Sequence, residues 1–244
     1  MIKRFYILAL IIAVLGFSGI GDAAYAKRKA RGKKQRTERI DGIDISHHNG
    51  LINWGKVTRE HPDIKFVYIK ATEGATWTDS NYEYNLKHAR KKGILAGSYH
   101  FFNYRCDAKT QFNNFKRNVD ASQQDIIPMV DFEKYGSEKN ATKAVKQLKS
   151  FCKMVKKHYG VYPMIYTNER IYNDLLWKDF GNYHLFIAKY KKQKPKLKGN
   201  ARYTIWQYSE RGKLRGVSEN VDLVRFHPDF SVYSITYSSK KKRK

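Results

Sequence analysis

The chain has 244 residues, with 48 Lys and Arg against 22 Asp and Glu, a formal net charge of +26, and 41% hydrophobic residues. This length suits a single α/β barrel, and the 18 Tyr, 13 Phe and 4 Trp supply enough apolar area to exclude disorder throughout the chain. The low count of 16 Gly excludes a collagen-like protein, and the lack of a persistent heptad excludes a coiled coil. Only one segment is continuously apolar, which excludes a multi-span membrane protein.

The apolar segment at the start of the chain predicts export. Lys3 and Arg4 form a positive n-region, residues 5–17 an apolar h-region, and Ala24-Tyr25-Ala26 a cleavage site of small residues. We therefore expect a signal peptide over residues 1–26 and a periplasmic, cell-envelope or extracellular protein. The apolar run is shorter than the roughly 20 residues of a membrane span. An uncleaved anchor is the alternative.

Two basic stretches flank the remaining chain. Residues 27–36 hold seven basic residues of ten, and residues 240–244 are all basic. Like charges repel and stay solvated, which predicts a disordered arm over 27–38, a folded domain over 39–233 and a basic tail over 234–244. An exported cationic protein suggests anionic cell-envelope polymers as partners. The chain has no recognisable nucleic-acid module, so no nucleic acid is expected.

From residue 40 onward, short β-rich runs alternate with amphipathic stretches. The expected helices carry apolar stripes such as Tyr82, Leu86 and Ala89, or end at a glycine such as Gly160; two further stripes run from Ala108 to Val119 and from Val145 to Tyr159. The expected strands span residues 42–46, 65–71, 94–101, 126–132, 162–167, 184–188, 203–208 and 221–224.

This alternation predicts a parallel sheet covered by helices. About eight strands in roughly 200 residues favour closure into an irregular TIM-like (β/α) barrel over an open doubly wound sheet. No GxGxxG turn follows any strand, which lowers the prospect of dinucleotide binding. The lysine-rich loop at 189–198 is either a solvated connection or a basic rim facing a substrate.

Four acidic residues fall at or near strand ends. Asp44 closes the first expected strand, Asp131 and Glu133 close the fourth, and Asp222 lies in the last. Active sites of such barrels lie at the carboxyl ends of the strands, so we expect these groups to converge. The two-residue period places Asp131 and Glu133 on one face, with Phe132 directed into the helical layer. Crowding should raise the pKa of one carboxyl group, as in the acid of a glycoside hydrolase.

A metal site is the rival interpretation of the acids. Asp44, His47, His48, Asp131 and Asp222 are all of ligand type, although adjacent histidines do not readily point the same way. No sequence feature demands a metal or an organic cofactor, and we expect none. Cys106 and Cys152 are the only cysteines and either pair or remain buried thiols.

Aromatic residues accompany the acids. Tyr99, Tyr166 and Trp206 each lie near a strand end, where a sugar ring could stack and a polar tip could donate a hydrogen bond. We expect this set to line a binding groove.

These segments resemble the lysozymes of glycoside hydrolase family 25, which are N-acetylmuramidases. The matching segments occur in the family's order, cover about residues 40–230, and comprise residues 42–50, 52–54, 68–74, 97–101, 131–133, 162–167, 187–188 with Tyr190, 206–208 and 221–223. Phe186 and Val224 depart from the family's usual Trp and Asn.

The resemblance implies an irregular (β/α) barrel that cleaves the β-1,4 bond between N-acetylmuramic acid and N-acetylglucosamine in peptidoglycan. Carried over by position, Glu133 is the general acid and Asp131 its partner, and Asp44 and Asp222 are further site carboxylates. Lys70, Tyr99, Tyr166 and Trp206 line the groove. The implied mechanism is retaining with assistance from the 2-acetamido group, while a nucleophilic Asp or an inverting water stays open.

Two other functions remain alternatives: a wall-binding barrel without catalysis, and a hydrolase of another N-acetylhexosamine polymer such as chitin. A monomer is expected, without a sequence feature that fixes the oligomeric state.

Overall fold

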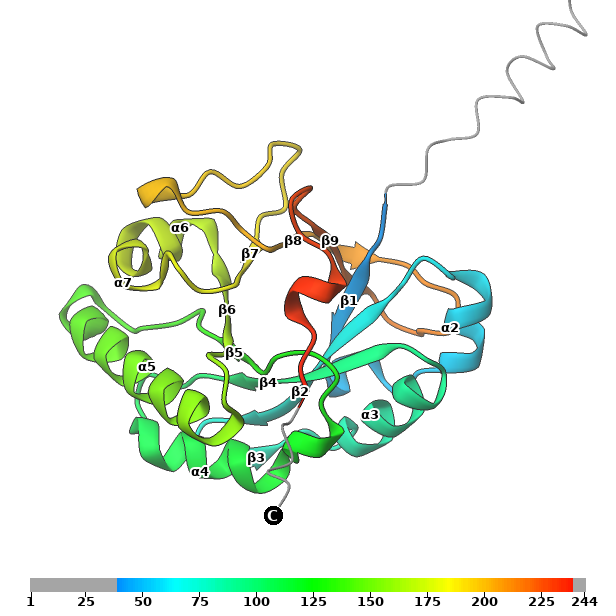
Figure 1. Ribbon diagram of the computed structural model, residues 1–244, viewed down its shortest axis with the longest axis horizontal. Helices are drawn as coiled ribbons and strands as arrows, with labels where there is room; N and C mark the ends of the chain where they lie inside the picture. The colour runs from blue at the N-terminus through cyan, green and yellow to red at the C-terminus, as the bar shows by residue number, and fades with distance from the viewer. Residues whose placement is uncertain (1–38, 239–244) are drawn as a thin grey trace, which may run out of the picture. The chain divides into compact units, whose positions relative to one another are not determined.

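The computed structural model describes residues 39–238, and Figure 1 shows the strands gathered at the centre with helices around them. The signal peptide expected over 1–26 and the basic arm expected over 27–38 lie outside the described residues. The strands are β1 (Gly42–Ile45), β2 (Phe66–Glu73), β3 (Trp77–Thr78), β4 (Leu95–Phe101), β5 (Met129–Asp131), β6 (Met164–Asn168), β7 (Leu185–Ala188), β8 (Ile205–Gly212) and β9 (Val221–Phe226).

The sheet closes on itself, which confirms the expected barrel. Its order is β1-β9-β8-β7-β6-β5-β4-β2-β3, and β1 also pairs with β2, so that β3 alone stands outside the closed ring. Neighbouring strands are parallel except that β9 runs antiparallel to both β1 and β8, and β3 antiparallel to β2. The expected parallel sheet is therefore present except at β9 and at the small β3, which run antiparallel to their neighbours. No helix lies between β8 and β9 in the described chain, so the chain simply reverses and pairs antiparallel.

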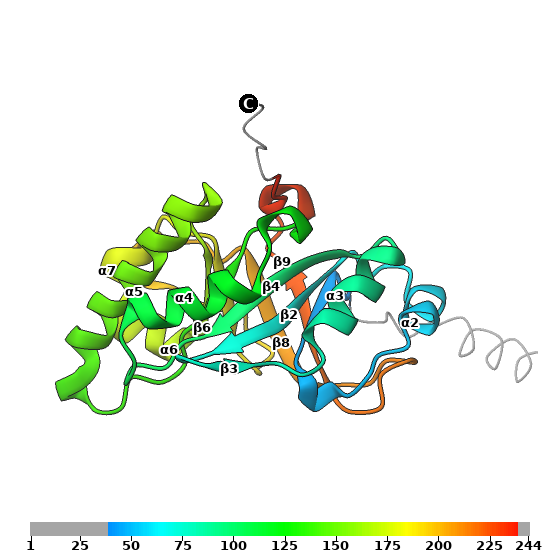
Figure 2. The same ribbon diagram turned by 90° about the horizontal axis from the view of Figure 1, so that it is seen from below.

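The helices and short turns form the outer layer, most densely on the side of β2, β4 and β5 (Figure 2). They are η1 (His47–Asn49), α2 (Trp54–Glu60), α3 (Tyr82–Lys91), α4 (Ala108–Asn118), η2 (Ala121–Gln123), α5 (Glu138–Tyr159), α6 (Glu169–Ile171), the π-helical turn η3 (Tyr172–Leu176), α7 (Trp177–Phe180), η4 (Lys198–Asn200) and η5 (Val232–Ile235).

The three helices expected from apolar stripes, α3, α4 and α5, are present. Gly160 ends α5 with φ of 80°, a left-handed conformation that suits glycine. The segment from α6 to α7 was not predicted, because its π-helical turn interrupts the regular 3.6-residue period.

Large aromatic side chains fill the barrel beneath the strand ends. Tyr68 is fully buried, donates its hydroxyl hydrogen bond to the Ile127 carbonyl (3.0 Å) and packs 6.1 Å from the ring of Phe186. A Cβ atom at Gly97 would lie 2.5 Å from Ile126 and 2.9 Å from Tyr68, so only glycine fits on β4 there. These buried side chains form part of the core of the barrel.

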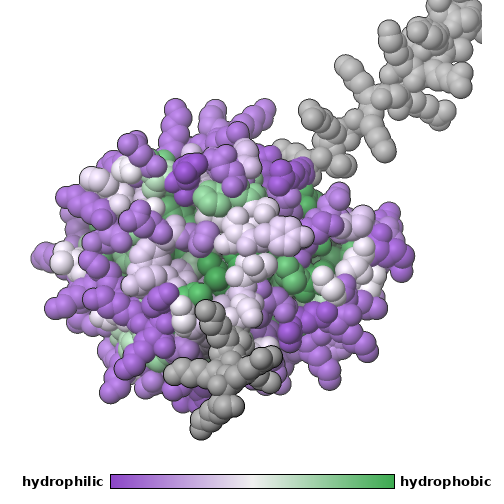
Figure 3. All heavy atoms as spheres, in the orientation of Figure 1, coloured by the Kyte–Doolittle hydropathy of each residue, from purple (hydrophilic) through white to green (hydrophobic). Residues whose placement is uncertain are grey.

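The folded domain continues past its expected end at residue 233. Ile235 is fully buried, and Tyr237 donates a hydrogen bond to the Tyr159 carbonyl (3.0 Å). Residues 234–237 therefore belong to the domain and not to a basic tail, because they also pair with the backbone of residues 125–127. The surface in Figure 3 is mainly hydrophilic, in keeping with the high charge.

The described residues decide between the two alternatives for the cysteines. Cys106 and Cys152 are free thiols, the second of them buried in α5. Within residues 39–238, no helix combines the length and the apolar character needed to cross a bilayer.

Candidate active site

Asp44 and Asp222 lie directly opposite each other where the first and last strands pair. Their Cα positions are partners in the antiparallel β1–β9 ladder, and Gln207 donates a hydrogen bond to Asp44 Oδ2 (3.0 Å). Burial and the neighbouring charge of Asp222 raise the pKa of Asp44 well above its ordinary value. Burial raises the pKa of Asp222 to about 6. Strand pairing thus brings together two acids from opposite ends of the domain.

Asp131 and Glu133 occupy the carboxyl end of β5. Asp131 is 6% exposed and is paired in register with Phe101 of β4 and Tyr166 of β6, while Phe132 is fully buried on the other face, 5.8 Å from the ring of Phe102. Burial and the charge of Glu133 raise the pKa of Asp131, and burial also raises the pKa of Glu133. Glu133 is the more exposed of the pair, which leaves it accessible to a substrate.

The four carboxyl groups form one electrostatic cluster. The charge of Glu133 raises the pKa of both Asp44 and Asp222, and the charge of Asp44 raises that of Asp131. A raised pKa lets a carboxyl group hold its proton at a pH closer to neutral than it otherwise would. The structure therefore brings together the four acids singled out from the sequence, in a site able to donate a proton.

Lys70 is a buried cation whose charge acts on this cluster. Its Nζ pairs with Glu73 (2.7 Å) and lies 4.8 Å and 4.6 Å from the ring centroids of Trp77 and Phe101. The charge of Lys70 lowers the pKa of both Asp131 and Glu133, against the larger effect of burial. Lys70 thus moderates the acidity of the site without neutralising it.

Tyr99 and Tyr166 both stand among the acids. Tyr99 is paired with Lys70 across the β2–β4 ladder, and its pKa is raised first by burial and then by the charges of Asp44 and Asp131. Tyr166 donates its hydroxyl hydrogen bond to Gln207 Oε1 (2.8 Å). Both hydroxyl groups stay protonated and serve as neutral hydrogen-bonding groups.

Gln207 is the residue that the sequence reasoning missed. Its Oε1 accepts hydrogen bonds from Tyr166 and Tyr190 (2.8 Å each), while its Nε2 donates to Asp44. Gln207 therefore links β6, the β7–β8 loop and β1 around the acids. The only available signal was its place between two aromatic residues in Trp206-Gln207-Tyr208.

Trp206 does not join the other groove residues. It is 1% exposed, donates its indole hydrogen bond to the Lys189 carbonyl (2.8 Å) and packs 4.2 Å from the Arg225 guanidinium. Because side chains alternate along β8, the inward position of Gln207 sends Trp206 outward. The exposed aromatic side chains at this end of the barrel are instead Tyr190 (47%) and Trp77 (39%).

The histidines proposed as metal ligands have another role. The backbone N–H and Nδ1 of His47 both lie 2.9 Å from Asp79 Oδ2, and Asp79 is 4% exposed. Asp79 thereby fixes the loop that follows β1. Among residues 39–238, no group of three or more His, Cys, Asp or Glu side chains is arranged to hold a metal ion.

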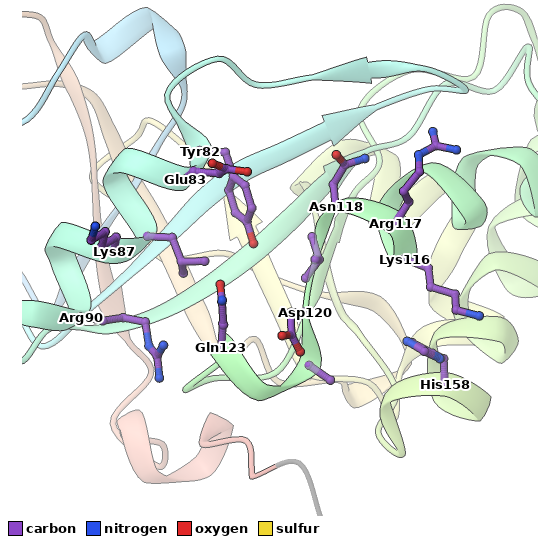
Figure 4. A pocket seen from close by; sticks show the side chains of 13 residues that line it. Tyr82, Glu83, Lys87, Arg90, Lys116, Arg117, Asn118, Asp120, Gln123 and His158 are labelled. Carbon is purple, nitrogen blue, oxygen red and sulfur yellow. The ribbon is translucent and has the colours of Figure 1, made fainter. Parts of the chain in front are cut away.

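Two cavities adjoin the acid cluster, and a larger one lies elsewhere. Glu133 lines both a cavity of about 560 Å³ and one of about 360 Å³. A larger cavity, about 840 Å³, lies on the outer wall between α3 and the end of α4 (Figure 4). Its acids, Glu83 and Asp120, come from separate elements and sit among Lys and Arg side chains. The cavities at Glu133 are the candidate active site.

Comparison with known proteins points to one family. Residues 43–217 match the sequence model described as glycosyl hydrolases family 25. The chain is 33% identical over 191 residues to the Escherichia coli K12 protein YegX, covering 77% of this chain and 70% of that protein. It is 30% identical over 206 residues to "Lysozyme M1" of Streptomyces globisporus, covering 78% and 69%. A solved family 25 glycosyl hydrolase from Bacillus anthracis has a TM-score of 0.69 and 32% identity, covering 78% of this chain and 90% of that one.

Proposed function

The chain belongs to glycosyl hydrolases family 25, and from this premise we propose that it is a muramidase that hydrolyses the β-1,4 bond between N-acetylmuramic acid and N-acetylglucosamine in peptidoglycan. The observation that carries the proposal is the cluster of Asp44, Asp131, Glu133 and Asp222. Burial raises the pKa of all four, and neighbouring negative charges add to the shift of the three aspartates. A glycoside hydrolase requires such a proton donor beside a second carboxyl group.

Glu133 is the general acid in this proposal. Burial raises its pKa, yet the side chain lines both cavities, so a protonated carboxyl group faces the position of a glycosidic oxygen. Its proton passes to the leaving oxygen as the bond from that oxygen to the anomeric carbon breaks. The resulting carboxylate then accepts a proton from the water that completes hydrolysis.

Asp131 assists by holding the 2-acetamido group of the muramic acid. Its Oδ1 is buried and has no hydrogen-bonding partner among the described residues, which suits an N–H donor from the substrate. The acetamido oxygen attacks the anomeric carbon, and the negative charge of Asp131 stabilises the oxazolinium that forms. Water then opens this ring, and the configuration at the anomeric carbon is retained.

The site of action is outside the cytoplasm, where peptidoglycan lies. The relative named "Lysozyme M1" supports a wall substrate, and the n-region, h-region and small-residue motif of residues 1–26 supply the means of export. Anionic cell-envelope polymers are further partners for a chain with net charge +26.

Substitution of the acid tests the proposal directly. Glu133→Gln removes the proton but keeps the shape of the side chain, and should lower the turnover of purified peptidoglycan by about 10²- to 10⁴-fold. The release of reducing ends measures turnover, and mass spectrometry identifies muramic acid at the new ends. Glu83→Gln, an exposed position on α3, is the matched control and should leave turnover unchanged. Turnover of the Glu133 variant comparable to wild type would refute the assignment.

A further inference from the structure

The two cavities beside Glu133 share one wall. Asn168 and Arg170, at the end of β6 and the start of α6, line both cavities together with Glu133. Asn168 accepts a hydrogen bond from the Ile171 backbone N–H (2.9 Å), which fixes the first turn of α6. The Arg170 side chain therefore projects from a fixed turn next to the acid.

This wall carries an excess of positive charge. Lys134 lines the larger cavity, Lys189 and Lys191 line the smaller one, and Arg170 lines both. Lys189 is neutralised by Glu169 (2.7 Å) and also donates to the Lys194 carbonyl (3.2 Å). The remaining cations, Lys134, Arg170 and Lys191, form what we call the basic rim.

The basic rim is open to a ligand. All three side chains are exposed, and within residues 39–238 neither an ion pair nor a hydrogen bond holds Lys134 or Lys191. Arg170 has one loose ion pair, 3.9 Å from Asp174, and the side chain is 81% exposed. The connection from β7 to β8, which carries Lys191, runs beside α6 (Figure 1). Three cations thus lie around Glu133. Of the two acids that line these cavities, Glu169 is paired with Lys189, and within residues 39–238 Glu133 forms no ion pair.

Resting on the proposed muramidase function, we propose that the basic rim binds carboxylate groups of the peptides attached to the glycan strand. The sugar rings of peptidoglycan are uncharged, and its lactyl carboxylates are consumed in the amide bonds to the peptides, so the available carboxylates belong to the peptides. A guanidinium and two ammonium groups around the scissile position match such groups in charge and hydrogen-bonding geometry. The rim makes the enzyme selective for strands that carry peptides.

The test compares one substrate in two charge states. Peptide-bearing glycan strands are used as purified, or after their carboxylates have been converted to carboxamides, and kcat/KM is measured from the release of reducing ends. Wild type should prefer the charged strands by about tenfold, and the preference should shrink as salt is raised. In the triple variant Lys134→Ala, Arg170→Ala, Lys191→Ala, the ratio of the two kcat/KM values should fall to near one.

A matched control separates this contact from general charge. Lys146→Ala, Lys153→Ala, Lys157→Ala removes the same charge from exposed positions on α5 and should keep the wild-type ratio. Because each ratio compares two substrates on one enzyme, a change in the pKa of Glu133 cancels. A wild-type ratio near one, or a triple variant that keeps the wild-type ratio, would overturn the proposal.

Strands stripped of peptide by an amidase carry free lactyl carboxylates. An equal preference for these strands over their amidated form would overturn the assignment to peptides. Loss of turnover in Glu133→Gln on both charged and amidated strands tests the muramidase function separately from the rim.

Discussion

The pKa values of Asp131, inside the barrel, and of Asp120, on its outer wall, are shifted in opposite directions. Asp131 at the end of β5 is 6% exposed, and burial and the charge of Glu133 raise its pKa. Asp120, at the start of η2, accepts the backbone N–H of Ser122 (2.8 Å), and this hydrogen bond lowers its pKa. The two residues are of the same type and close in sequence. Their surroundings alone decide in which direction the pKa of each is shifted.

On the outer wall, the charge of an acidic side chain is also balanced by a cation. Asp125 receives two hydrogen bonds from the Arg90 guanidinium (2.9 and 3.1 Å) and one from the Ala96 backbone N–H (3.1 Å). In the barrel, Lys70 lowers the pKa of Asp131 and Glu133 but is already paired with Glu73. Asp120 and Asp125 on the outer wall therefore have N–H or guanidinium partners for their oxygens, while burial raises the pKa of the acids around Glu133.

The largest difference in turnover is expected when one aspartate of each region is replaced by asparagine. Asp131→Asn removes the negative charge proposed to stabilise the reacting sugar, and we expect turnover of peptidoglycan to fall by about a hundredfold or more. Asp120→Asn keeps an oxygen that can cap η2, because asparagine caps helices as well as aspartate does, and turnover should not change. Initial rates of reducing-end release measure both. Equal losses in the two variants would contradict the comparison.

Stability should respond in opposite directions in the two regions. The folded-state pKa of Asp44 is raised above its unfolded value of about 3.9, so its carboxyl group favours folding at low pH and loses this contribution as pH rises through the folded-state pKa. Asp222, with a pKa of about 6, behaves likewise. Asp44→Asn is neutral at every pH and should raise the free energy of unfolding at pH 8 by about 1–2 kcal/mol, with no gain at pH 4.

The outer wall supplies the control for this stability test. Asp125→Asn breaks the charged pair with Arg90 and should lower the free energy of unfolding at pH 8. Urea denaturation at the two pH values measures both variants. An Asp44 variant less stable than wild type at pH 8 would show that its carboxylate is stabilised by a contact other than the hydrogen bond from Gln207.

The sequence predicted the eight strands of the closed ring and the meeting of Asp44, Asp131 and Glu133, because these depend on local rules. Alternation places Asp131 and Glu133 on one face, and the carboxyl ends of parallel strands meet at one end of a barrel. Asp222 was expected there too, but it reaches this end from the start of β9, because that strand runs antiparallel. The partners of these acids depend on distant residues. Gln207 reaches Asp44 across 163 positions of sequence, and no local pattern reports this contact.

Two other features escaped prediction for physical reasons. Trp206 is of a residue type that often stacks on sugar rings, but the direction of its side chain depends on which residues of β8 face inward. The antiparallel direction of β9 depends on the lack of a helix in the connection from β8, and the sequence shows only a short polar segment there. The direction of a strand and the face on which a side chain lies are set by tertiary pairing and not by residue type.

Removing the charge of Lys70 should shift the pKa of Asp131 and Glu133 still further upward, away from the lowered pKa of Asp120 on the outer wall. Lys70 lowers the pKa of Asp131 and Glu133, so Lys70→Met should raise both. Glu133 acts in its protonated form, and activity falls as pH rises through its pKa. The basic limb of the kcat/KM profile should therefore shift upward by about half a pH unit, a modest shift because Glu73 already balances much of the Lys70 charge. Lys65→Met, an exposed position just before β2, is the matched control and should leave the limb in place. A downward shift in the Lys70 variant would mean that the limb reports a group that must be ionised, and Glu133 would then not be the acid.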